Sequence, residues 1–519
     1  MRTQRLDWRA RAAIALENHQ SSLACIVSFA ILMALHRSYD IRGMQFDAGQ
    51  YWALAVPSVL VNMPSPRGYV FPALLVPLRY LCDVLPNPDL VFRLGLSAVY
   101  AVALALLVPA AFQQAFGGKV TFVRRLVPVV LLAAIFPGLL LYSLSDLPAL
   151  LLALGGLCLA LRGTQQATAA RFAGMLAASG ALMAAAYNTR TIYLFALAAL
   201  LTLLAIRGPR VRTAFPRWLG IAAAVAGIVA VSLPQLVINK RTTGVASLGV
   251  QSRVDNHNLF SSQLVWGMTL QRYETTISPD APAPTVFYLD PAGEKLFNDV
   301  AAQGDLFSLP YYLKVVALHP LHFLALFSRH AINGLDVRDG IVYTRKPSPL
   351  RTRTALFNFA VLALAGWVAW SIRARSGSPP PGFRPAPGSW PLSLALLLLP
   401  VAAIVPGAIE TRFFLPLHLL AYCTIAFHFH AAGLRQSVQQ HGAAIAITLV
   451  AAAGLFFTVT RSTMAELQYG WPDLYRHGLP PKQAATVTGA QKCDRLRSRS
   501  ATPEDPREWP HPGTRTRLS

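Results

Sequence analysis

Eleven apolar runs, each long enough or nearly long enough to cross a lipid bilayer, limit what this sequence can fold into. A helix needs about 20 predominantly apolar residues to span the hydrocarbon core. One such run is compatible with a buried helix of a large soluble protein, but eleven in one chain are not. The sequence therefore predicts an all-α polytopic membrane protein with about 11 transmembrane helices. The runs lie at 21–36, 94–116, 126–144, 147–161, 172–188, 191–206, 218–238, 354–372, 390–409, 413–432 and 442–460.

Charged residues make up only 13% of the 519 residues, against about 25% in soluble proteins. The formal net charge is nevertheless +23. These charges are dispersed between the apolar runs and form no contiguous basic module, so we expect membrane lipid, and no nucleic acid, as a partner. The five cysteines include no C-x-x-C pair, which argues against a disulfide framework or a zinc site.

The first apolar run follows four arginines and resembles a signal sequence. Its end, His36-Arg37-Ser38-Tyr39, carries no small-x-small cleavage site, so we interpret the run as the first transmembrane helix. With the N-terminus placed inside, the inner segments hold seventeen Lys and Arg and only two Asp and Glu. This asymmetry predicts a cytoplasmic N-terminus and an extracytoplasmic C-terminus in a cell inner (plasma) membrane.

The predicted organisation has three parts. Residues 1–20 form a cytoplasmic segment, 21–460 form the transmembrane domain, and 461–519 form an outer, partly disordered tail. The transmembrane domain carries two long outer loops, 37–93 and 239–353. Two pieces of these loops are expected to lie as helices in the membrane interface. One is 69–85, which is apolar enough to cross but is interrupted by Pro72, Pro77, Arg79 and Asp83, and the other is the amphipathic piece from Tyr311 to Ile332.

Polar residues occur at four places beside or between the long apolar runs, and the predicted sidedness puts all four on the outer face. Charges beside membrane spans are costly and point to function. Each has an ordinary alternative: Asp47 and Asp146 can cap helices, and Arg190 and Arg412 can reach the interface as membrane anchors. Glu410 can pair with Arg412 alone. The four places are 45–51 around Asp47, 143–148 around Asp146, Asn188-Thr189-Arg190, and Glu410-Thr411-Arg412.

Two carboxylates and two guanidiniums on one outer face suit glycosyl transfer from a lipid phosphate. A carboxylate can act as general base on an acceptor hydroxyl. Arginines bind phosphate through forked hydrogen bonds at the level of the lipid headgroups. A polyprenyl-phosphate donor needs such a base, a phosphate clamp and an apolar groove.

Several segments in order resemble the GT-C superfamily of polyprenyl-phosphate-dependent glycosyltransferases. The resemblance is to the protein mannosyltransferase and aminoarabinose transferase group, glycosyltransferase family 39. It covers roughly residues 20–430. The segments are Phe46-Asp47-Ala48-Gly49-Gln50-Tyr51 with Pro64-Ser65-Pro66-Arg67-Gly68-Tyr69, Leu144-Ser145-Asp146-Leu147-Pro148, Asn188-Thr189-Arg190, Leu233-Pro234-Gln235, and Glu410-Thr411-Arg412-Phe413-Phe414-Leu415-Pro416.

The resemblance implies an inverting glycosyltransferase with Asp47 as catalytic base. It implies that Asp146 orients the acceptor or sugar, or helps to hold a divalent metal where members use one. Arg190 and Arg412 are expected to bind the donor's phosphate or sugar, and Tyr51, Arg67 and Glu410 to contribute to substrate binding. Ala48 stands where many members have Glu, which weakens a metal site.

The expected acceptor is a glycan, lipid or protein of the cell envelope. Two other functions remain open. An O-antigen polymerase or ligase also has many spans and a large outer loop. A multi-pass transporter is disfavoured because the centres of the spans are nearly free of charge and no internal repeat is visible.

Overall fold

Helices form most of the computed structural model of this chain. It describes residues 8–39, 46–61, 63, 67–207, 217–254, 257–275, 285–338, 351–374 and 389–469. Every one of the eleven apolar runs falls largely in helix. The helices concerned are α1 (Trp8–Ser38), α4 (Pro88–Val102) with the π-helical turn η2 (Ala103–Leu107) and α5 (Val108–Phe116), α6 (Phe122–Ile135) with α7 (Pro137–Leu141), α8 (Asp146–Gly163), α9 (Ala169–Thr189), η3 (Thr191–Tyr193) with α10 (Leu194–Arg207), α11 (Arg217–Thr243), α16 (Arg351–Ala374), α17 (Ser389–Ile404), α18 (Leu415–His428) and α19 (Ala431–Ala465).

Seven helices of the described part are long and apolar enough to cross a membrane, or eight if a bent pair counts as one span. The multi-pass helical membrane fold is thus confirmed, whereas the count of eleven spans is not. The runs at 126–144 and 413–432 show the reason, because each continues beyond its helix. The 14 residues of α6 and of α18 extend about 21 Å at 1.5 Å per residue, less than a hydrocarbon core of about 30 Å.

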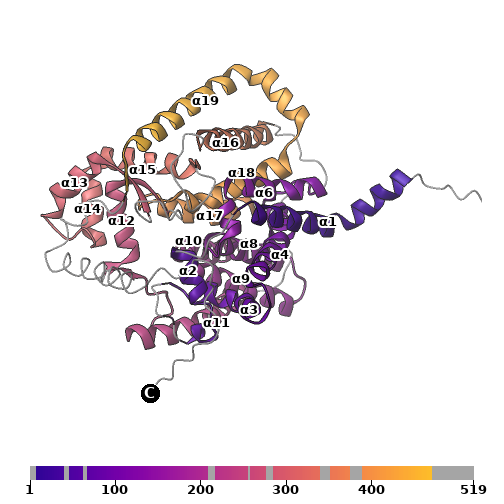
Figure 1. Cartoon of the computed structure of the whole chain (residues 1–519), viewed down its shortest axis with the longest axis horizontal. Coiled ribbons are helices and arrows are strands. Elements are labelled where there is room, and N and C mark those ends of the chain that lie inside the picture. The colour runs from indigo at the N-terminus through magenta and orange to yellow at the C-terminus, as the bar shows by residue number, and fades with distance from the viewer. Residues whose placement is uncertain are drawn as a thin grey trace, which may run out of the picture.

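The centre of the bundle is α8, most of whose residues are buried. It packs against α9, which in turn packs along α11 (Figure 1). Glycine allows the second of these contacts to be close, since a Cβ on Gly227 would lie 1.9 Å from the carbonyl oxygen of Ala177. Small residues at such crossings are typical of helix packing in membranes.

The 37–93 connection contains α2 (Phe46–Ala53), the short 3-10 turn η1 (Pro57–Leu60) and α3 (Val70–Val84). The predicted interfacial segment 69–85 therefore is one helix of 15 residues with Pro77 inside it. Its outward side chains include Leu74, Tyr80 and Val84. This helix is not among those long and apolar enough to cross a membrane in the described part.

The 239–353 connection folds into a unit beside the bundle (Figure 1). It contains the strand pair β1 (Arg253–Val254) and β2 (His257–Asn258), then α12 (Leu259–Thr269), β3 (Leu270–Thr275), β4 (Thr285–Leu289), α13 (Pro291–Ala301), α14 (Leu309–Leu318) and α15 (Pro320–Leu335). The prediction of one amphipathic helix from Tyr311 to Ile332 is wrong, because α14 and α15 meet at 105°. The chain turns at His319, and Pro320 begins the second helix, where its missing N–H is not needed.

An antiparallel three-stranded sheet joins this unit to the end of the described chain. Its order is β3–β4–β5, and β5 (Leu467–Tyr469) directly follows α19. Residues 461–465 of the predicted tail therefore continue α19, and 467–469 belong to the sheet. The rest of the predicted tail lies outside the described residues, as does 375–388, which contains most of the Pro-rich connection before α17.

Candidate functional site

Six charged side chains from five separate parts of the chain converge at one end of the helical bundle. We call them the charge cluster. They sit on α2, in the segment before α3, at the first residue of α8, just after α9, and at the turn η4 (Thr411–Phe414) that precedes α18. All six were candidates from the sequence. The members are Asp47, Arg67, Asp146, Arg190, Glu410 and Arg412.

Arg412 is the centre of the cluster. Its guanidinium lies 3.1 Å from Oδ2 of Asp47, 3.7 Å from Oδ2 of Asp146 and 2.6 Å from Oε2 of Glu410. Only 6% of its side chain is exposed. Arg412 therefore does not extend to the membrane surface as an anchor. It also does not pair with Glu410 alone, because Asp47 and Asp146 contact it as well.

Asp47 is held between two guanidiniums. Arg67 donates to its Oδ1 over 2.6 Å, and Arg412 occupies the other oxygen. Burial raises the pKa of Asp47, but Arg412 and Arg67 outweigh burial and hold the pKa well below its usual range. The carboxylate is therefore ionised at neutral pH. Tyr51, the seventh candidate, lies under Arg67, with 4.8 Å between ring centre and guanidinium carbon, and donates to the hydroxyl of Ser145.

Asp146 is 4% exposed and forms an ion pair with Arg190 through its second oxygen. The N-cap of α8 is Ser145, whose side chain makes no capping hydrogen bond. The carboxylate of Asp146 thus pairs with Arg190 and Arg412 and does not cap the helix. The guanidiniums of Arg190 and Arg412 both lie over the ring of Phe413, at 4.8 and 5.5 Å from its centre.

Local contacts fix the two segments that carry Arg67 and Arg190 against each other. Asn188, two residues before Arg190, accepts a hydrogen bond from the backbone N–H of Val70 over 2.8 Å. Its amide donates to Gln235 on α11. Gly68 permits this approach, since a Cβ there would lie 1.9 Å from the carbonyl oxygen of Asn188.

Strand β3 holds Glu410 in place, and no feature of the sequence indicated it. Thr275 donates to Oε1 of Glu410 from its hydroxyl at 2.8 Å and from its backbone N–H at 3.1 Å. The backbone N–H of Thr411, the residue after Glu410, donates to the carboxylate of Glu274. Burial raises the pKa of Glu410, and Arg412 and the Thr275 hydroxyl oppose that rise. Thr275 and Glu410 are 135 residues apart, which is why periodicity and spacing did not connect them.

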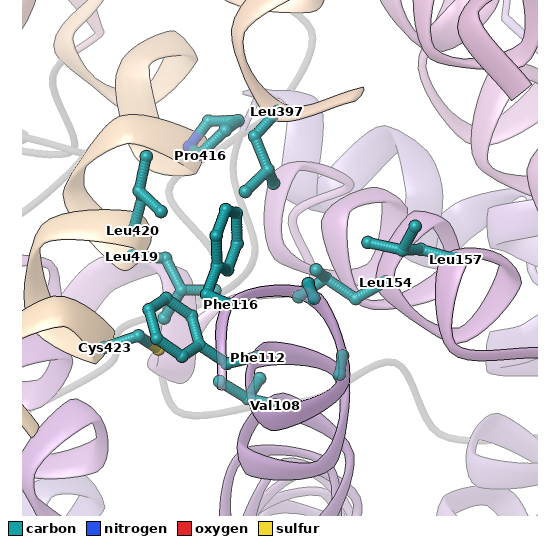
Figure 2. A pocket seen from close by; sticks show the side chains of 12 residues that line it. Val108, Phe112, Phe116, Leu154, Leu157, Leu397, Pro416, Leu419, Leu420 and Cys423 are labelled. Carbon is teal, nitrogen blue, oxygen red and sulfur yellow. The ribbon is translucent and has the colours of Figure 1, made fainter. Parts of the chain in front are cut away.

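Two adjoining cavities lie beside the cluster. The first is bordered by Asp146, Arg190, Arg412 and Phe413 together with apolar residues of η3, α17 and α18. The second is apolar, with side chains from α5, α8, α17 and α18 (Figure 2). Pro416 lines both cavities. A cavity with charged residues in its wall thus shares one wall residue with an apolar cavity.

The carboxylates of the cluster do not fit a metal ion. Among the described residues, no three or more His, Cys, Asp or Glu are arranged to hold one. Asp47, Asp146 and Glu410 all face guanidiniums. Ala48, at the position where the resemblance leads one to expect a further carboxylate, is fully buried.

No family model, curated protein or solved structure matches this chain.

Proposed function

We propose that this multi-pass membrane protein is an inverting glycosyltransferase. It moves a sugar from a polyprenyl-phosphate donor to a glycan, lipid or protein acceptor of the cell envelope, on the extracytoplasmic face of the inner membrane. The observation that supports this most strongly is the pair Arg190 and Arg412 at the border of an opening whose wall continues into an apolar cavity. A donor that is anionic at one end and hydrocarbon at the other matches that combination.

The donor's phosphate belongs at the two guanidiniums over Phe413. Arg190 and Arg412 are fixed there by Asp146, and planar guanidiniums donate forked hydrogen bonds to phosphate oxygens. The polyprenyl chain then extends past Pro416 toward the apolar cavity (Figure 2), whose walls are Phe112, Leu154, Leu420 and their neighbours.

The chemical step is an in-line substitution at the anomeric carbon of the sugar. The acceptor hydroxyl forms the new C–O bond, and Asp47 takes its proton. The bond between the anomeric carbon and the phosphate oxygen breaks, and the lipid phosphate leaves with the electron pair. The two arginines stabilise the charge that develops on the leaving phosphate.

Asp47 enters this reaction as an anion but a weakly basic one, because two guanidiniums share it. Its basicity rises when one of them turns toward the donor's phosphate. Arg67 is the freer of the two, with 28% of its side chain exposed against 6% for Arg412. Donor binding before acceptor attack therefore activates the base.

The experiment is a donor screen with purified protein in lipid nanodiscs. Polyprenyl-phosphate sugars are supplied with candidate acceptors, and transfer is followed by mass spectrometry. We expect transfer from at least one monophosphate-linked sugar and its loss in Asp47→Asn. Asp89→Asn, which removes an exposed carboxylate paired with Arg93 outside the cluster, is the matched control and should stay active.

Three outcomes contradict the proposal. Transfer only from diphosphate-linked oligosaccharides indicates the polymerase or ligase class instead. Passage of a solute across sealed vesicles without any transfer indicates a transporter. Full turnover by folded Asp47→Asn removes Asp47 from the role of base.

A further inference from the structure

Three carboxylates from distant parts of the chain meet around one guanidinium. Asp47, Asp146 and Glu410 lie 3.1, 3.7 and 2.6 Å from Arg412. We propose that Arg412 is a built-in cation that takes the place of a divalent metal among these carboxylates, so that the reaction of this site proceeds without a metal ion. The inference uses the same site as the proposed glycosyltransferase, and its catalytic part rests on that function.

Carboxylates from several segments around one cation are otherwise typical of divalent-metal sites. Mg²⁺ and Mn²⁺ gather carboxylate oxygens from several segments and fix their relative positions. A guanidinium offers five N–H donors in one plane, so it can serve three carboxylates at once. Arg412 does so with its Nε and both terminal nitrogens.

The charges of the cluster are already balanced. The three carboxylates face the three guanidiniums of Arg67, Arg190 and Arg412, which gives 3 − 3 = 0. A divalent ion added to this set would leave an excess of two positive charges in a largely buried place, which is costly. A metal therefore fits only if the guanidinium of Arg412 is absent.

Arg412 is also held in position by its neighbours. Glu410 pairs with it from one side and itself accepts a hydrogen bond from Thr275 on β3. Phe413 lies against its face. Because a guanidinium keeps its charge at every physiological pH, the cation of this site is not lost to chelators or to moderate acidity.

The test exchanges one cation for the other. Arg412→Ala leaves three carboxylates against two guanidiniums, and we expect it to gain one Mn²⁺ site that wild-type protein lacks. Mn²⁺ binding is measured by electron paramagnetic resonance on purified protein, without any substrate. The gained site should disappear in the double variant Arg412→Ala/Asp146→Asn. Arg93→Ala, which frees one exposed carboxylate elsewhere, should gain none.

Thermal unfolding gives a second readout that needs no activity. Arg412→Ala should melt at a lower temperature than wild type, and either Mn²⁺ or guanidinium ion should restore part of the loss. Arg412→Lys keeps a single positive charge, so it should melt higher than Arg412→Ala and should not gain the Mn²⁺ site.

Turnover is then compared with and without EDTA. Wild-type transfer should be unchanged by EDTA, and Arg412→Ala should lose about 100-fold or more of its kcat. Wild-type turnover that falls with EDTA and returns with Mn²⁺ overturns the inference, and so does folded Arg412→Ala that binds no Mn²⁺. If Arg412→Ala does not fold, the EDTA result on wild type decides. A gained Mn²⁺ site in a protein that transfers no sugar from any donor supports the charge substitution and refutes the proposed function.

Discussion

The guanidinium of Arg412 lies 3.1 Å from the carboxylate of Asp47, although 365 residues separate them in the sequence. The contact joins the short helix α2, which follows the first apolar helix, to the turn that opens α18. The charge cluster is therefore a product of the complete fold rather than of any local motif.

Replacing Arg67 by Gln should move the acid limb of the pH–rate profile to higher pH. Arg67 lowers the pKa of Asp47, so its removal raises that pKa toward the ordinary carboxylate value. Activity that needs ionised Asp47 is then lost earlier as the pH falls. The measurement is kcat/KM from pH 6 down to about pH 2.5, where the wild type should stay flat and the variant should begin to lose activity, with Arg93→Gln as control. An acid limb that stays in place would show that Asp47 is not the group being titrated.

Replacing Thr275 by Val should lower kcat roughly tenfold and leave the KM for the donor nearly unchanged. The variant removes the 2.8 Å hydroxyl bond to Glu410 and with it part of the constraint on Arg412. A hydrogen bond to a charged group contributes about 1.5–3 kcal/mol. Thr275→Ser keeps the hydroxyl and should restore the rate. Equal rates for the Val and Ser variants would mean that Thr275 does not position the site.

Replacing Arg190 by Lys should raise the KM for the donor at least tenfold. A lysine ammonium cannot donate a planar fork, and it loses the stacked position over Phe413. Titration of inorganic phosphate or a short-chain prenyl phosphate as inhibitor isolates this effect, because it measures binding of the phosphate without the sugar. Unaltered inhibition in Arg190→Lys would place the phosphate elsewhere.

Replacing Leu420 by Trp should discriminate against donors with long chains. Leu420 lines the apolar cavity, and an indole there would fill the space in which we propose that the polyprenyl chain lies (Figure 2). We expect a higher KM for long-chain donors and no change for donors with one or two isoprene units. Leu321→Trp, at a position 81% exposed on α15, is the control. Equal losses with both chain lengths would indicate general damage to the fold.

The sequence allowed four members of the charge cluster to be assigned to one face of the membrane. Asp47, Asp146, Arg190 and Arg412 could be grouped because apolar runs and basic loops predict which helix ends share a face. Glu410 stands two residues before Arg412, and Arg67 belongs to the same outer segment as Asp47, 20 residues further along the chain. The pattern of contacts within the cluster could not be predicted, because no feature of the sequence indicates that Arg412 contacts three carboxylates at once.

The strands and helix lengths were beyond such reasoning. The sheet β3–β4–β5 includes the pairing of β4 with β5, which lie far apart in the sequence, and its first strand carries Thr275, which donates to Glu410. Hydropathy also locates an apolar run without fixing where its helix breaks. The runs at 126–144 and 413–432 both continue beyond their helices. The bend between α14 and α15 at Pro320 is of the same kind, since the amphipathic pattern continues through it.

The pairing of β5 with β4 makes the sheet beside the charge cluster include the last described segment of the chain. Thr463, at the end of α19, also bonds to Gln271 on β3, the strand that carries Thr275. Residues 467–469 follow every described membrane helix in the sequence, so the ribosome makes them after those helices. A chain interrupted before them would keep its apolar helices and lack the strand that completes this sheet.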